Sequence, residues 1–384
     1  MEGSQPVDAA LTDTRTVIIT TARPAAAATR VERVHYLVVT AGAEPGRRVR
    51  LGPRPLRLGR RAPCELVLAD PEVSALHCEV GADADADAAW VDDRGSTNGS
   101  YVDGVRVEGR AALPNGALLQ LGQQVLKHEY RPWREAERSD ELDRDLQQAG
   151  RYIRSLLPPP NPQGPVRTDW VFEPSAQLGG DAFGYFAIDE HRFAGYLIDV
   201  SGHGIGAAVH TVSVLNVMRQ RALGGVDFGD PAQVLARLNE MFPMEEHGGL
   251  FFTFWYGVYD LAARRLRYAS AGHHPAYLVD PGRSALQPLR TRNPMIGALP
   301  PRAFAAAEVE VAPGSTLYVF SDGVFEIDTV QGRCWGLGDF TPLLLEPPEA
   351  GLSEPLRLQR RVRAAALPGP LADDFSILAV TFPT

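Results

Sequence analysis

Five aspartates between residue 166 and the last residue, 384, stand where an apolar run meets a turn. They are Asp181, Asp199, Asp322, Asp373 and Asp374. The first follows two glycines, the next two each follow a predicted buried strand, and the last pair directly precedes the final strand. A carboxylate at the mouth of a strand is rigidly held yet open to solvent, and a neighbouring glycine lets a ligand approach the backbone. Each position alone suits an ordinary turn residue, whereas the repetition predicts that the carboxylates converge.

Converging carboxylates repel one another unless a cation neutralises them, so this pattern predicts a metal site. Ligands that are all oxygen suit hard, hydrated cations such as Mg²⁺ or Mn²⁺ rather than zinc. Two such ions can hold a phosphoryl group between them and lower the pKa of a bridging water. That water is then a nucleophile, and no covalent enzyme intermediate is needed.

A second group of polar residues lies in the first third of the chain. Gly59-Arg60, Ser74-x-x-His77 and Thr97-Asn98-Gly99 stand at the ends of predicted strands, where loops can gather on one edge of a sandwich. An arginine fork and small hydroxyls suit the several acceptor oxygens of a phosphate. An asparagine side chain can fix a peptide backbone because it offers both a donor and an acceptor.

The elements that must position these residues fall into four segments. Residues 1–32 lack hydrophobic periodicity and are predicted to be a disordered tail. Residues 33–131 alternate short apolar runs with turn signals, which predicts an all-β sandwich. Residues 132–165 are predicted to be a helical linker with a proline-rich end. Residues 166–384 mix strands and helices with few strand-helix-strand alternations, which favours a layered α+β domain.

Apolar runs define the individual elements. In the sandwich the predicted strands are 35–40, 55–58, 65–68, 78–80 and 118–128. In the second domain the predicted strands are 193–198, 250–259, 265–269, 276–279, 316–320 and 375–382, and a helix is predicted over 205–222.

The linker helix is predicted over 139–157, with Ser139 as its N-cap and three prolines after its end. Its apolar residues are spaced four, three, four and three, as in a heptad seam: Leu142, Leu146, Ala149, Ile153 and Leu156. Two heptads are fewer than a coiled-coil assignment needs. The seam therefore has two interpretations, a single helix packed on the next domain or a homodimer contact.

Length, charge and composition exclude several classes of protein. At 384 residues the chain is long enough for two domains, and a formal charge of −9 argues against a nucleic-acid binder. No apolar run is long enough to span a bilayer, and no secretory signal is evident. The three cysteines form no CxxC pair. We therefore expect a cytoplasmic protein that binds neither nucleic acid nor membrane.

The motifs around the aspartates occur in a fixed order. They are Gly179-Gly180-Asp181, Asp199-Val200-Ser201-Gly202-His203-Gly204, Ala271-Gly272-His273, Ser321-Asp322-Gly323 and Asp373-Asp374-Phe375-Ser376. In order and spacing they resemble the SpoIIE-like branch of PPM phosphatases over about residues 166–384. The resemblance implies an α/β/β/α fold and a protein serine/threonine phosphatase that acts on regulatory proteins with two or more Mn²⁺ or Mg²⁺ ions.

The same resemblance assigns roles by position. Asp181, Asp199, Asp322 and Asp373 would be the catalytic metal ligands, the Val200 carbonyl would add a backbone ligand, and Asp374 is a further candidate ligand. Many relatives carry a histidine two residues after the second of these aspartates, as a proposed proton donor. Here that position is Ser201, so metal-bound water or another group must supply the proton. A turn role is preferred for His203 and a structural role for the 273–274 histidine pair.

The motifs of the first domain resemble a forkhead-associated (FHA) domain over about residues 35–129. The resemblance implies that Arg60, Ser74 and Thr97 contact the phosphate of a phosphothreonine peptide, that Asn98 contacts its main chain, and that a structural histidine follows at position 77. The family often has arginine directly after the serine, but this chain has Ala75.

Together the two resemblances imply a phosphatase that reaches its substrates through phosphothreonine. The implied partners are phosphothreonine-containing proteins, a Ser/Thr kinase or its substrates, and an anti-sigma-factor antagonist. The alternative is an adaptor with a degenerate phosphatase domain, but a pseudoenzyme is free to lose its acidic residues, and these are intact.

Overall fold

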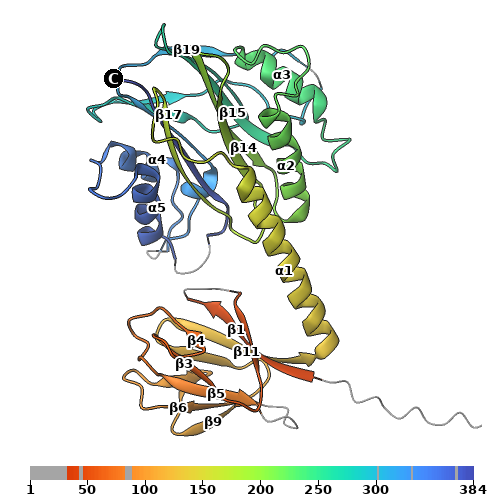
Figure 1. The fold of residues 1–384 in the computed structure, drawn as a ribbon, viewed down its shortest axis with the longest axis vertical. Coiled ribbons are helices and arrows are strands. Elements are labelled where there is room, and N and C mark those ends of the chain that lie inside the picture. The colour runs from red at the N-terminus through yellow and green to blue at the C-terminus, as the bar shows by residue number, and fades with distance from the viewer. Residues whose placement is uncertain (1–32, 43–45, 83–88, 301, 330–331, 368–370) are drawn as a thin grey trace, which may run out of the picture.

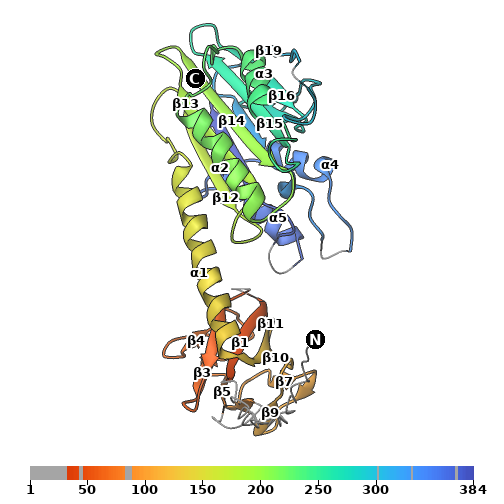
Figure 2. The same cartoon turned by 90° about the vertical axis from the view of Figure 1, so that its right-hand side faces the viewer.

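The computed structural model describes residues 33–42, 46–82, 89–300, 302–329, 332–367 and 371–384. The tail predicted over 1–32 lies outside the described residues. Two domains are joined by one long helix, α1 (Trp133–Leu156), as Figures 1 and 2 show.

The first domain is a β-sandwich, as its sequence predicts. One sheet has the order β2-β1-β11-β10-β7-β8 and the other has the order β4-β3-β5-β6-β9. Their bounds are β1 (Arg33–Ala41), β2 (Arg48–Leu51), β3 (Leu56–Gly59), β4 (Leu66–Val67), β5 (Cys78–Ala82), β6 (Ala89–Asp93), β7 (Ser100–Val102), β8 (Val105–Arg106), β9 (Arg110–Leu113), β10 (Leu118–Leu121) and β11 (Gln124–Pro132). Alternate residues of both sheets, such as Leu37, Val80 and Leu126, are fully buried in one core.

The single strand predicted over 118–128 is wrong, because this stretch is a hairpin. β10 and β11 pair in antiparallel register, with Leu121 opposite Gln124. Gly122 takes a φ of +58°, which reverses the chain. The Asp70 carboxylate fixes the turn by accepting the Gln123 N–H at 2.8 Å. The turn carries a single glycine, and an isolated glycine inside an apolar run can equally mark a bulge within one strand, so the sequence pattern does not distinguish the two.

The second domain consists of two stacked five-stranded sheets with helices on both outer faces. The sheet orders are β12-β21-β20-β17-β18 and β13-β14-β15-β16-β19. The strands are β12 (Arg167–Glu173), β13 (Asp181–Ala187), β14 (Arg192–Val200), β15 (Phe252–Asp260), β16 (Arg265–Ala271), β17 (Ala276–Val279), β18 (Leu286–Leu289), β19 (Ala307–Glu310), β20 (Thr316–Phe320) and β21 (Phe375–Thr381). The α-helices are α2 (Ile205–Arg219), α3 (Pro231–Met241), α4 (Leu337–Phe340) and α5 (Glu354–Ala365), and the 3₁₀ turns are η1 (Asp322–Val324) and η2 (Thr341–Leu345).

The layers are in the order predicted by the resemblance, helix, sheet, sheet, helix. α2 and α3 contact the β13–β16 sheet, and α5 contacts β12 and β21 of the other sheet. Figure 1 shows α2 and α3 on one side of the two sheets and α4 and α5 on the other. Residues such as Trp255, Val319 and Leu378 are fully buried in the core between the sheets, and the Trp255 indole N–H donates to the Leu289 carbonyl of the opposite sheet. Every strand pair inside these two sheets is antiparallel, and this agrees with the α+β prediction.

Helix α1 begins six residues earlier than the predicted N-cap Ser139. It follows β11 directly, with Pro132 at the N-cap position and no side-chain cap. Trp133 packs on the outer face of β1, against a cluster that includes Tyr36, and this contact starts the helix early. The Ser139 hydroxyl instead accepts a hydrogen bond of 2.7 Å from Arg48, whose guanidinium also reaches Asp143.

The last turns of α1 pack on the second domain of the same chain. Ile153 is buried against Leu178 and Ala208, and Leu146 and Ala149 pack on the same cluster. Leu142 remains 54% exposed. Most of the heptad-like seam is therefore covered within one chain, as a single packed helix requires. The homodimer stays a prediction. No helix among the described residues is long and apolar enough to cross a membrane.

Candidate metal centre and phosphopeptide interface

Strand register brings the first two aspartates together. Asp181 opens β13 and Asp199 lies one residue before the end of β14, and the antiparallel pairing sets them directly opposite each other. Across the next pair, Asp199 faces Thr253 of β15, whose hydroxyl lies 3.5 Å from its carboxylate. Residues in register on neighbouring strands have side chains on the same face of the sheet. The Asp181 and Asp199 carboxylates therefore lie on the same face of this sheet, at the same end of the paired strands.

The second sheet supplies the other aspartates at its matching edge. Asp322 opens η1, immediately after β20, and Asp373 and Asp374 precede β21. Because β20 and β21 are antiparallel neighbours, the end of one and the start of the other lie at the same edge. The backbone is tight here, since a Cβ on Gly323 would lie 2.3 Å from the Asp374 carbonyl oxygen. Glycine is therefore required beside Asp322.

The two edges enclose one cavity of about 280 Å³. Its described lining is Gly180, Asp181, Asp199, Val200, Ser201, Gly202, His203, Phe251, Thr253, Asp322, Ala372, Asp373 and Asp374. All the residues predicted for the metal site border this cavity, and no lysine or arginine is among its described lining residues. Strand ends far apart in sequence therefore produce one concentrated patch of negative charge.

Burial and mutual repulsion make these carboxylates hard to ionise. Burial first, and then the charges of Asp322 and Asp373, raise the pKa of Asp199 to about 7. Burial and the neighbouring Asp373 raise the pKa of Asp322 to about 6. The pKa of Asp181 lies well above its usual value, because it is buried and faces Asp199. Because these carboxylates are buried and repel one another, a bound cation would stabilise their ionised forms.

The donor set fits a hard divalent cation in its chemistry, since it consists of carboxylate and carbonyl oxygens. In the described part of the chain, however, no three His, Cys, Asp or Glu side chains lie close enough to form a ready-made metal-binding group. The carboxylates would have to turn toward a shared ion. Metal ligation by Asp181, Asp199, Val200, Asp322 and Asp373 therefore remains a proposal.

Asp374 is already engaged in positioning the loop that precedes β13. One carboxylate oxygen accepts the Ser175 N–H at 2.8 Å and its hydroxyl at 3.0 Å, and the other accepts the Gly180 N–H at 2.6 Å and the Asp181 N–H at 3.3 Å. Gly179 must be small, because a Cβ there would lie 2.4 Å from the same carboxylate. These contacts favour a positioning role for Asp374 over direct metal ligation.

An Asp374→Asn variant should be destabilised by about 2 kcal/mol, because one carboxylate oxygen that accepts N–H groups becomes an amide donor facing them. The Gly179–Asp181 loop would also be loosened, so the Mn²⁺ affinity should fall. Chemical denaturation and a Mn²⁺ titration measure both effects, with the exposed Asp145→Asn on α1 as the matched control. An Asp374→Asn variant with the stability and Mn²⁺ affinity of the wild type would show that the network has no such role.

Serines that the sequence did not single out connect the two sheets. Ser376 of β21 donates to the Asp181 carboxylate at 2.7 Å, and the Ser321 hydroxyl accepts the Ser376 N–H at 3.1 Å. The Ser321 hydroxyl also donates to the Asp374 carbonyl at 2.9 Å. Both serines flank predicted aspartates, and that adjacency was the available signal.

Ser201 and His203 line the cavity, whereas His273 and His274 are not among its described lining residues. The Ser201 hydroxyl accepts the Phe251 N–H at 3.2 Å, so this residue ties the segment before β15 to the cavity. His203 is exposed and lines the cavity. Burial is the main reason why the pKa of Asp373, which also lines the cavity, is raised above its ordinary value. His273 is buried and is not among the described lining residues, and neither is His274, whose ring packs on that of Phe320 in a tilted geometry. The preferred structural role of the histidine pair agrees with this burial.

The raised carboxyl pKa values predict how the metal-free protein responds to pH. The pKa of Asp199 is about 7 in the folded chain, against an ordinary value of 3.8. Between about pH 4 and pH 7 the unfolded chain therefore binds fewer protons, so the stability that this group contributes falls as pH rises. With chelator present, Asp199→Asn should melt above the wild type at pH 8 and close to it at pH 4. Equal shifts at both pH values, measured by thermal melting, would contradict this origin.

In the first domain, three loops at one end of the sandwich bring the predicted phosphate-binding residues together. Arg60 directly follows β3, and its backbone N–H donates to the Ser74 carbonyl at 2.9 Å. The Ser74 hydroxyl accepts the Thr97 N–H at 3.1 Å, and their hydroxyls lie 3.4 Å apart. Arg60 Nε is buried and has no hydrogen-bond partner in the structure. A cation and two hydroxyls are thus available to one anion.

Two further contacts stiffen these loops. His77 is fully buried and accepts the Ser74 N–H at 3.1 Å on one ring nitrogen, while the other lies 3.1 Å from the Gly99 carbonyl oxygen. His77 is therefore a structural residue, as expected. Asn98 donates to the Glu72 carbonyl at 2.8 Å, which fixes its amide beside the hydroxyl pair.

Fold and site together define the class: an FHA sandwich joined to a PP2C-like α/β/β/α domain. Residues 189–383 match stage II sporulation protein E (SpoIIE), and residues 56–122 match the FHA domain. The chain belongs to the SpoIIE family, because this match covers half of its length. Asp181 lies before the matched range, whereas all four predicted phosphopeptide residues lie inside the FHA match.

Individual relatives agree with both matches. The phosphoserine phosphatase RsbP of Bacillus subtilis (strain 168) is 30% identical over 188 residues, which are 48% of this chain and 45% of RsbP. The FHA domain-containing protein FhaB of Mycolicibacterium smegmatis is 39% identical over 92 residues, or 24% of this chain and 57% of FhaB. The SiaA-PP2C domain of Pseudomonas aeruginosa shares the fold, with a TM-score of 0.55, 21% identity and coverage of 64% of this chain and 99% of that domain. This chain spans about half the length of the curated relatives it matches.

Proposed function

We propose that this chain is a metal-dependent protein serine/threonine phosphatase that its FHA domain directs to phosphothreonine-bearing regulatory proteins. The observation that carries the proposal is the convergence of four predicted aspartates from two sheets on one cavity with no described basic lining residue. Membership of the SpoIIE family supports it. RsbP and RsbU of Bacillus subtilis are named phosphoserine phosphatases.

Different residues of the chain would have different roles in hydrolysis. Asp181, Asp199, Asp322, Asp373 and the Val200 carbonyl would hold two or more Mn²⁺ or Mg²⁺ ions. Such ions, when bound, supply charge neutralisation of the phosphoryl group and a water of lowered pKa. Asp374 and Ser376 fix the carboxylates at the cavity edge. His203, which lines the cavity, would be a candidate to move a proton at the leaving oxygen, although its turn role is preferred from the sequence.

The FHA domain would choose the partners. Arg60, Ser74 and Thr97 would hold a phosphothreonine phosphate, and Asn98 the peptide main chain. Partners of this kind include a Ser/Thr kinase or its substrates, and the phosphatase domain would act on such proteins or on an anti-sigma-factor antagonist. A cytoplasmic setting belongs to this proposal, and the cysteines Cys64, Cys78 and Cys334 are free in the structure.

Phosphate release from peptides tests the proposed activity. With Mn²⁺, the purified full chain should release phosphate from phosphoserine and phosphothreonine peptides, and chelation should stop the release. No release from either peptide, together with intact binding of phosphothreonine peptides, would favour an adaptor with a degenerate phosphatase domain instead.

A further inference from the structure

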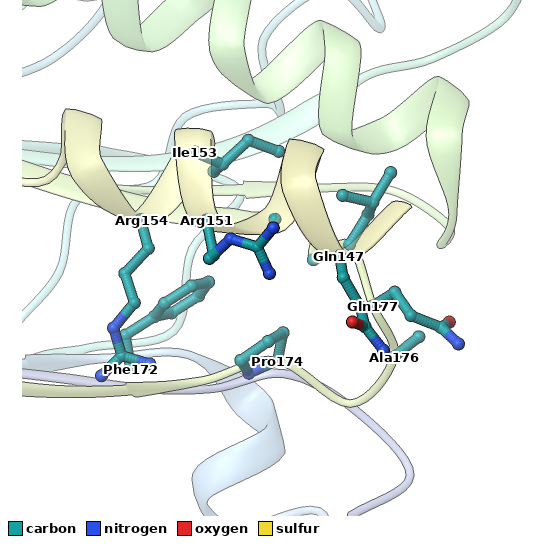
Figure 3. A pocket seen from close by; sticks show the side chains of 11 residues that line it. Gln147, Arg151, Ile153, Arg154, Phe172, Pro174, Ala176 and Gln177 are labelled. Carbon is teal, nitrogen blue, oxygen red and sulfur yellow. The ribbon is translucent and has the colours of Figure 1, made fainter. Parts of the chain in front are cut away.

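A second cavity lies between the linker helix and the segment that leads to the metal-site loop. Its volume is about 330 Å³, and one wall is α1 from Gln147 to Arg154 while the other is residues 172–179. Figure 3 shows Arg154 and Gln147 extending from α1 toward the opposite wall, which carries Phe172 and Pro174. This volume suits a small molecule, whereas a folded peptide segment or a phospholipid would exceed it.

The two walls are held at a fixed spacing. Gly150 lies so close to the opposite wall that a Cβ on it would be 2.5 Å from the Gln177 carbonyl oxygen. A glycine inside a helix costs about 1 kcal/mol relative to alanine, so its presence in α1 is explained by this close approach. Below it, Ile153 and Leu178 are buried in a shared cluster. The cavity is therefore a built feature and does not depend on one mobile side chain.

The floor and the rim of the cavity differ in chemistry. Phe172, Ile153 and Leu178 supply apolar surface and are each at most 6% exposed. Arg151 and Arg154 stand at the rim, and among the described residues neither guanidinium has an ion-pair or hydrogen-bond partner. Among the residues that the structure describes, no acidic one lines this cavity, although the formal charge of the chain is −9. Gln147 and Gln177 add amide groups.

We propose that this cavity binds a small organic anion with an apolar body of about ring size. The apolar body would lie on the Phe172 side, and its carboxylate, sulfonate or phosphate would accept hydrogen bonds from Arg151 and Arg154. Arginine suits this role because its planar fork matches such groups with two parallel hydrogen bonds. The inference does not depend on the proposed phosphatase activity, since binding is measured directly.

Calorimetric titration of the full chain with 1-naphthalenesulfonate tests the proposal. One site per chain is expected, and the neutral 1-naphthalenesulfonamide should bind at least about 10-fold more weakly, as expected for lost charge-assisted hydrogen bonds. Arg151→Gln with Arg154→Gln should weaken sulfonate binding by a similar factor. The matched control, Arg134→Gln with Arg138→Gln, changes the charge of the same helix equally at residues that do not line this cavity.

A variant that fills the cavity provides a second test of whether the sulfonate binds there. Ala176 is exposed at the cavity, so Ala176→Phe should leave the fold intact while abolishing sulfonate binding. Inorganic phosphate, which lacks an apolar body, should bind at least about 10-fold more weakly than the sulfonate, because it buries no apolar surface. Absent binding, equal affinity in the 151/154 double variant, or equal affinity for inorganic phosphate would each overturn the proposal.

Discussion

An Asp322→Asn variant should lose Mn²⁺-dependent hydrolysis of p-nitrophenyl phosphate by at least about 100-fold, since even residues that only support metal ligands cost 10- to 100-fold when replaced. Asp322 sits where β20 ends and faces the carboxylate cluster from the second sheet. An amide is nearly isosteric with the carboxylate, so the variant should fold. It removes one negative charge from the cavity, and this weakens its attraction for a divalent cation.

Asp145→Asn is the control for that experiment. It makes the same chemical change on an exposed position of α1 that does not line the cavity. Hydrolysis by this control should equal that of the wild type. Activity that survives both chelation and the Asp322→Asn substitution would rule out the metal mechanism.

The second large effect concerns the FHA domain. Arg60→Ala should weaken phosphothreonine-peptide binding by about 10- to 100-fold, because a charge-assisted hydrogen bond contributes about 1.5–3 kcal/mol. Hydrolysis of p-nitrophenyl phosphate should be unchanged, since Arg60 lies in the other domain. Fluorescence anisotropy with a labelled peptide measures the first quantity and a colorimetric assay the second.

The neighbouring Arg61 provides a matched control. It is exposed and follows Arg60 directly, so Arg61→Ala removes the same charge from the same loop without removing the buried guanidinium nitrogen. Its peptide affinity should stay within about threefold of the wild type, since exposed charges contribute less than about 1 kcal/mol. Equal losses of peptide binding in both variants would mean that only the local positive field matters.

The strand-end aspartates could be predicted from the sequence because their signal is local. Each lies beside an apolar run and a glycine, and the structure places all of them around one cavity. The residue that lies opposite each aspartate on the neighbouring strand could not be predicted from a local signal of this kind. Asp181 faces Asp199 only because β13 and β14 pair without a bulge, and a pairing register depends on the whole sheet.

The missed features share a physical cause, namely contacts between segments distant in sequence. Asp374 stays a candidate ligand, but its hydrogen bonds could not be predicted, because the N–H groups that it accepts come from residues nearly 200 positions earlier in the chain. Helix α1 starts at Trp133 rather than at Ser139 because a tertiary contact with β1 outweighs the local capping signal. The 118–128 hairpin was missed because an isolated glycine does not by itself predict a turn, and the Asp70 carboxylate that fixes this turn lies 53 positions earlier in the chain.

Manganese-edge anomalous diffraction from crystals grown with Mn²⁺ tests the central claim most directly. Two or more anomalous peaks are expected in the cavity, with Asp181, Asp199, Asp322, Asp373 and the Val200 carbonyl as the surrounding oxygens. Asp374 should keep its hydrogen bonds to Ser175 and Gly180. Crystals of a Mn²⁺-active preparation with no anomalous peak in this cavity would contradict the account.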